Sequence, residues 1–100
     1  MPVLRVNLQE GFANDTVVVR VNGQEVFNKT SVKTRPQIGL ANAFEVDVPE
    51  GSVDIQIALP LKNVSESFEL QVSNPIHLGV SITHEGRITH QISQEPFGYL

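Results

Sequence analysis

The chain contains no cysteine and no tryptophan, and it has only one tyrosine. Without cysteine the fold has no disulfide bonds and no thiolate metal site, and catalysis by a thiol nucleophile is excluded. The same absence fits a reducing compartment. Sugar-binding surfaces usually present exposed aromatic rings, so the shortage of tryptophan and tyrosine argues against carbohydrate as the first choice of ligand.

Basic residues are also few. The chain has seven Lys and Arg and eleven Asp and Glu, which gives a net charge of −4. Nucleic-acid binding depends on cations that neutralise phosphates, so we expect no nucleic-acid partner. No apolar run approaches the length of a membrane span, and no basic segment followed by an apolar core marks a signal peptide. We therefore expect no membrane partner and a cytoplasmic location.

Helical periodicity is missing as well, and seven segments instead place an apolar residue at every second position. Successive side chains of a strand point to opposite faces, so this pattern predicts strands with one buried face. The segments are residues 4–8, 17–21, 44–48, 53–59, 68–72, 76–82 and 88–92. They predict an all-β fold, an antiparallel β-sandwich of about eight strands with an immunoglobulin-like or jelly-roll-like organisation. A small β-barrel is the alternative.

The length of 100 residues and the even composition predict one domain over residues 1–100. Residues 94–100 form an apolar C-terminal tail that is not strand-like. Chain ends are usually polar and frayed unless something holds them. We therefore expect this tail to cover its own sandwich or to dock onto another chain.

Three turn signals predict three hairpins. Asn22-Gly23 is typical of a type I′ turn and predicts Val21 opposite Gln24, Arg20 opposite Glu25 and Val19 opposite Val26. The stretch from Pro49 to Ser52 predicts a hairpin with Val48 opposite Val53, which would align Asp47 with Asp54. A loop from His84 to Gly86 predicts Ile82 opposite Ile88, Val80 opposite His90 and Leu78 opposite Ile92.

The first two of these turns, Val-Asn-Gly and Val-Pro-Glu-Gly-Ser-Val, resemble turns of many immunoglobulin-like and carbohydrate-binding sandwiches. This likeness lies in the turn chemistry over about a quarter of the chain. Turn chemistry recurs in unrelated β-proteins, so the resemblance carries no site residue to this chain.

No catalytic or metal-binding constellation emerges from the predicted registers. His77 falls on the polar face, His84 in a turn and His90, half-buried, on the apolar face, so the three histidines do not converge on one ion. Glu45, Asp47 and Asp54 form an acidic patch on a flat strand face, which we expect to be solvated. No Gly-x-Ser-x-Gly motif or phosphate-binding glycine loop is present. We predict no enzyme, no metal and no cofactor.

Two segments are candidates for binding. The loop of residues 30–42 holds Lys33 and Arg35, with Lys29 just before it, so it concentrates basic side chains in an acidic protein. The tail carries the apolar side chains Phe97, Tyr99 and Leu100. These five residues of the loop and the tail, Lys33, Arg35, Phe97, Tyr99 and Leu100, are the predicted ligand or partner contacts.

The leading hypothesis is a non-catalytic protein-interaction or structural module. Such a sandwich would present a sheet edge, its loops and its tail to a protein partner, which can be a second copy of itself. A partly apolar outer face formed by Val18 and Phe27 supports this hypothesis. The alternative is a small-ligand or carbohydrate-binding domain that uses the loop of residues 30–42.

Overall fold

The computed structural model describes residues 2–35, 37, 39–73 and 75–95. All seven alternating segments form strands, as predicted. The elements in chain order are β1 (Val3–Leu8), β2 (Asp15–Val21), β3 (Gln24–Val32), β4 (Asn42–Asp47), β5 (Gly51–Leu59), η1 (Pro60–Lys62), β6 (Val64–Val72), β7 (Ile76–Ile82) and β8 (Ile88–Ser93). Within these residues no helix is long and apolar enough to cross a membrane.

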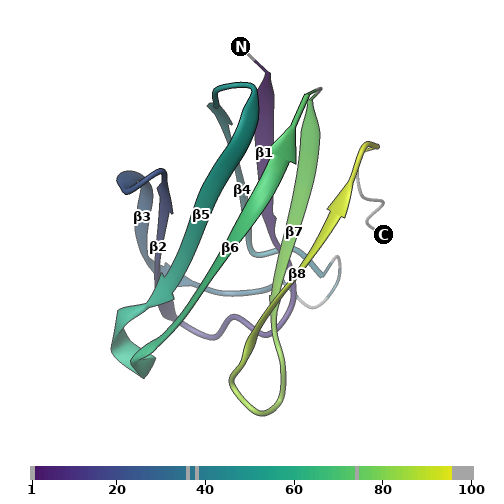
Figure 1. The fold of residues 1–100 in the computed structure, drawn as a ribbon. Helices are drawn as coiled ribbons and strands as arrows, with labels where there is room; N and C mark the ends of the chain where they lie inside the picture. Colours follow the sequence, from purple (N-terminus) through teal and green to yellow (C-terminus); the bar gives the residue numbers. More distant parts are fainter. Residues whose placement is uncertain (1, 36, 38, 74, 96–100) are drawn as a thin grey trace.

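The strands form two packed sheets, which confirms the predicted β-sandwich (Figure 1). Sheet A has the order β4-β1-β7-β8, and sheet B has the order β3-β2-β5-β6. Both sheets keep unpaired edges, so the barrel alternative is wrong. The strand pairs of both sheets are antiparallel except β1 and β7, which run parallel.

The core lies between the sheets and is built from alternate residues of both, as a sandwich requires. Its largest side chains are almost fully buried aliphatic groups, which stabilise the fold by leaving water. They are Leu4, Leu8, Ile55, Ile57, Leu59 and Leu78, together with the valines Val6, Val17, Val19, Val48, Val53 and Val72.

The Asn22-Gly23 hairpin forms as predicted for its first two pairs, Val21 with Gln24 and Arg20 with Glu25. The third pair is wrong, because Val19 faces Phe27 rather than Val26. A register shift between Val19 and Arg20 inserts one extra residue into β3. Such a bulge bends and twists the strand that carries it.

Because of this bulge, the prediction that Val18 and Phe27 form an apolar outer face is wrong. Phe27 packs against the core, and its ring stacks on Phe44 of β4 at a centroid distance of 4.3 Å. Val18 does lie on the other side of β2 from Val17 and Val19, but it is only 6% exposed. Neither side chain therefore offers an open apolar surface.

The second predicted hairpin is wrong. β4 pairs with β1 in sheet A, whereas β5 pairs with β2 and β6 in sheet B, so residues 48–50 cross between the layers. Asp47 consequently faces Val3, and Asp54 faces Glu69. The two strands bury the same alternating pattern whether they pair side by side or face each other, so the pattern alone could not separate the two arrangements.

The third hairpin forms in the predicted register, with Ile82 opposite Ile88, Val80 opposite His90 and Leu78 opposite Ile92. The prediction that His90 is half-buried is wrong, because this side chain is exposed. β8 is an edge strand, so only part of its inner face is covered. The His90 ring instead stacks on Phe68 of β6, with 3.8 Å between the ring centroids.

The two ring pairs close opposite sides of the sandwich. Phe27 and Phe44 join β3 to β4 at one side, and Phe68 and His90 join β6 to β8 at the other. In both pairs the rings are nearly parallel, at 10° and 4°. Stacked rings bury area and add a specific attraction, so they hold the edge strands of the two layers together.

Candidate functional site

The predicted basic loop is shorter than residues 30–42, because β3 extends through Val32. Thr34 ties the loop to the segment after β1: its amide donates to the Phe12 carbonyl at 2.9 Å, and its hydroxyl donates to the Gln9 carbonyl at 2.6 Å. Lys33 and Arg35 flank Thr34, and both are exposed. The two exposed basic side chains therefore flank a residue whose backbone and side chain are hydrogen-bonded to the segment after β1.

The other three predicted contacts, Phe97, Tyr99 and Leu100, lie outside the described residues. The predicted acidic patch is not assembled, because Glu45 and Asp47 belong to sheet A and Asp54 to sheet B. Glu45 instead accepts a hydrogen bond from Arg5, its cross-strand neighbour on β1, at 2.6 Å. Opposite charges directly across a strand pair stabilise that pairing.

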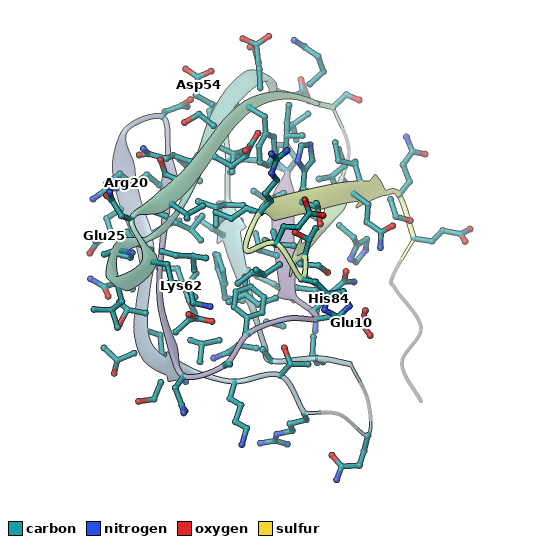
Figure 2. All side chains as sticks on the ribbon, turned by 90° about the horizontal axis from the view of Figure 1, so that it is seen from below. Glu10, Arg20, Glu25, Asp54, Lys62 and His84 are labelled. Atoms are coloured by element: carbon teal, nitrogen blue, oxygen red, sulfur yellow. The ribbon has the colours of Figure 1, made fainter. Side chains whose placement is uncertain are left out.

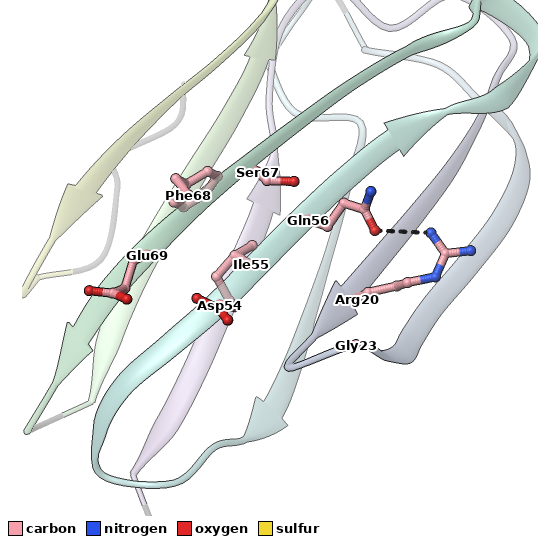
Figure 3. A pocket seen from close by; sticks show the side chains of 8 residues that line it. All are labelled: Arg20, Gly23, Asp54, Ile55, Gln56, Ser67, Phe68 and Glu69. Carbon is pink, nitrogen blue, oxygen red and sulfur yellow. Dashed lines mark hydrogen bonds between the residues drawn. The ribbon is translucent and has the colours of Figure 1, made fainter.

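A shallow hollow of about 450 Å³ lies against sheet B (Figure 3). The Arg20 guanidinium donates to Gln56 Oε1 at 3.3 Å, and these residues face each other across β2 and β5. Ser67 of β6 continues this row, and the opposed carboxylates of Asp54 and Glu69 lie beside it. The sequence could not predict this row, because it depends on the pairing of β5 with β2 and β6.

A second, larger hollow of about 840 Å³ lies where the β7–β8 loop meets η1 and the segment after β1. Glu10 and His84, which are labelled in Figure 2, both line it. Lys62 also lines it, but its ammonium is 3.0 Å from the buried Asp15 carboxylate. Among the described residues no group of three or more His, Asp or Glu side chains has an arrangement suited to a metal ion. Neither hollow contains Lys33 or Arg35.

The four edge strands differ sharply in charge. β3 carries Glu25 and Lys29, β4 carries Glu45 and Asp47, and β6 carries Glu66 and Glu69. β8 has the sequence Ile-Thr-His-Gln-Ile-Ser, with no Asp, Glu, Lys, Arg or Pro. Charges, prolines and bulges are the devices by which proteins prevent an edge from pairing with another chain. β8 lacks all of them.

The backbone of β8 is regular, because its six pairs with β7 show no register shift. Its far side is not paired with any strand of the described chain. Ile92 is 49% exposed at this edge, although it lies on the same face as the buried Ile88. Within the described residues, β8 therefore combines an edge that no other strand pairs with and a partly exposed apolar side chain.

The outer face of β8 is supported by a polar cluster. The Gln9 side chain is buried, and its Oε1 accepts hydrogen bonds from Ser81 Oγ at 3.4 Å and from Gln91 Nε2 at 3.5 Å. Gly79 makes room for it, since a Cβ there would lie 2.8 Å from Gln9 Nε2. The Phe68 ring stacks on His90 at the inner face, so β8 has side-chain contacts with the rest of the chain on both faces.

This uncharged, supported edge is the candidate functional site. The sequence contained part of the signal, because the charge-free run of residues 88–93 is visible there. The position of this run at the edge of a sheet is not visible in the sequence, because strand order is a property of the tertiary fold. Comparison with known protein families and with curated proteins finds no match to this chain.

Proposed function

We propose that this protein is a non-catalytic interaction module that binds an extended segment of a protein partner along the β8 edge. The main observation behind this proposal is that, among the four described edge strands, only β8 has no charged residue. The backbone of β8 is also regular, and Ile92 is partly exposed. A strand added there gains main-chain hydrogen bonds from β8, and side-chain contacts on alternate residues supply selectivity.

Pre-organisation supports this proposal. A strand that is already extended loses little conformational freedom when a partner binds, so more of the interaction energy appears as affinity. β8 is ordered on one face by the stacked Phe68 ring and on the other by the Gln9 side chain. Most of the conformational entropy lost on binding is then lost by the partner segment, because only that segment must become extended.

The test is selection of a random peptide display library on the immobilised protein and on two matched variants. Gln91→Lys places a cation on the β8 edge, and Gln71→Lys makes the same change at an exposed glutamine of the β6 edge. We expect peptides that bind the parent and the Gln71→Lys protein but lose at least tenfold in affinity for the Gln91→Lys protein, because charged edges resist strand addition. Equal binding to all three proteins, or no enrichment, contradicts the proposal.

A second candidate is binding of a small polar ligand at the hollow against sheet B. The row of Arg20, Gln56 and Ser67 favours it, because these side chains offer donors and acceptors on one surface. This candidate differs from the alternative expected from the sequence, which uses the loop of residues 30–42. Titration with neutral monosaccharides, followed by amide NMR shifts, tests it: shifts confined to β2, β5 and β6 that disappear in Gln56→Ala support it.

A further inference from the structure

The two ends of β8 carry opposite charges. Arg87 immediately precedes the strand, Glu95 follows it after one residue, Gln94, and both charged side chains are exposed. Between them lies the uncharged strand of residues 88–93. The strand is therefore uncharged along its length, with Arg87 just before it and Glu95 beyond its end, while a further exposed acidic side chain, Glu85, lies in the loop two residues before Arg87.

This order of charges is complementary to itself only when two copies run antiparallel. A parallel pair would bring Arg87 beside Arg87 and Glu95 beside Glu95, and like charges on neighbouring strands are destabilising. In an antiparallel pair each basic end meets an acidic end, twice by symmetry.

The face pattern restricts the register of such a pair. If the two-fold axis passes through His90, Ile88 lies opposite Ile92 of the second copy, and Thr89 lies opposite Gln91. The first pair covers the exposed part of Ile92 with an apolar side chain, and the second keeps polar groups on the outer face. A slip of one residue in one strand would oppose Ile92 to Thr89 and mix the two faces.

In this register Arg87 lies opposite Ser93, the last residue of β8 in the second copy, and Glu95 of that copy follows two residues later, in the bend after the strand. Long side chains can span the distance of about 7–8 Å that separates diagonal neighbours of an antiparallel pair. The charge complementarity and the apolar match therefore occur in one arrangement.

The other edges do not share this property. Self-pairing of β6 would concentrate Glu66 and Glu69, and self-pairing of β4 would concentrate Glu45 and Asp47. β3 has one charge of each sign, but its ladder contains two register shifts and Ser31 has a φ of 56°, so the edge is irregular. Irregular, twisted edges resist pairing.

We propose that the strand received by β8 is β8 of a second copy of this chain, antiparallel and centred on His90. This inference rests on the proposed function, because it names the occupant of the same edge. The pairing joins two four-stranded A sheets into one continuous sheet across a two-fold axis.

The test measures dimerisation of the full chain by sedimentation equilibrium at low salt, where exposed charges are least screened. Arg87→Glu and Glu95→Arg are each expected to weaken the dimer about five- to tenfold, since each creates two like-charge contacts. The double variant restores both contacts and is expected to return to within about threefold of the parent. Glu69→Arg on β6 is the matched control and is expected to leave the dissociation constant unchanged.

Mixing the two single variants provides a sharper readout, because one chain then has two acidic ends and the other two basic ends. We expect the mixed dimer to form in preference to either homodimer, as resolved by native mass spectrometry with one chain isotopically labelled. A statistical mixture, or charge effects that also follow Glu69→Arg, overturns the proposed pairing.

The outcomes separate this inference from the proposed function. A protein that stays monomeric at all concentrations, yet selects peptides that depend on β8, overturns only the second copy as occupant. A monomer whose selected peptides do not depend on β8 overturns both. A dimer that tolerates Gln91→Lys and Ile92→Lys without weakening overturns the assignment of β8 as its interface.

Discussion

Single residues in this protein decide how closely a loop can approach a strand. Gly11 has a φ of 90°, and a Cβ at this position would collide with the carbonyl of Ile82. The close approach arises because the Ile82 amide donates to the Glu10 carbonyl at 2.8 Å. The backbone bond that attaches the loop after β1 to the end of β7 therefore requires glycine next to it.

At this scale, Gly11→Ala is expected to lower the free energy of unfolding by about 3 kcal/mol, from a steric clash with backbone added to left-handed strain. Gly86→Ala is the matched control, because Gly86 has a φ of 81° but no heavy atom within 4 Å of its Cβ position. It should cost only about 1 kcal/mol. Urea denaturation measures both, and equal losses would contradict the role assigned to the Ile82 contact.

At the scale of strands, a one-residue bulge changes which side chains close the sandwich. The hairpin alignment from Asn22-Gly23 alone leaves Phe27 on the outer face. The bulge in β3 instead lets Phe27 meet Phe44 of the other sheet. Turn chemistry sets the first pairs of a hairpin, but packing against another layer decides the later ones.

A double-mutant cycle tests this closure. Phe27→Ala and Phe44→Ala are each expected to cost about 2 kcal/mol, less than for a fully buried ring because both are half-buried. Their coupling energy should be about 1 kcal/mol, as for other stacked rings. Phe27→Ala combined with Phe68→Ala, on the opposite side of the sandwich, should be additive within about 0.5 kcal/mol. Coupling of the same size in both cycles would show that the stack is not specific.

At the scale of the whole molecule, the architecture depends on pairings between distant segments. β1 lies between β4 and β7, so the first strand of the chain is held by residues from its middle and its last third. Contacts of this kind require long loops to close before they stabilise the fold. They also decide that β8, rather than β7, becomes an edge.

The apolar tail belongs to this scale, because its role depends on what the rest of the molecule leaves uncovered. Deleting residues 96–100 is expected to lower the melting temperature or to change the native mass, since an apolar chain end is stable only when something covers it. Calorimetry and native mass spectrometry measure the two effects. Replacing Phe97 and Tyr99 by Ser in the full-length chain separates the apolar contacts from chain length. No change in either quantity would contradict both roles predicted for the tail.

The amino-acid sequence by itself determined the strands, the Asn22-Gly23 turn, the β7–β8 register and the absence of charge along residues 88–93. These properties depend on neighbours in the chain, which a two-residue period and a tight turn specify directly. The tertiary structure alone decided that β4 pairs with β1, that β3 bulges and that β8 lies at an edge. Both layers bury the same alternating face, so only the packing of one layer on the other selects which strands become neighbours.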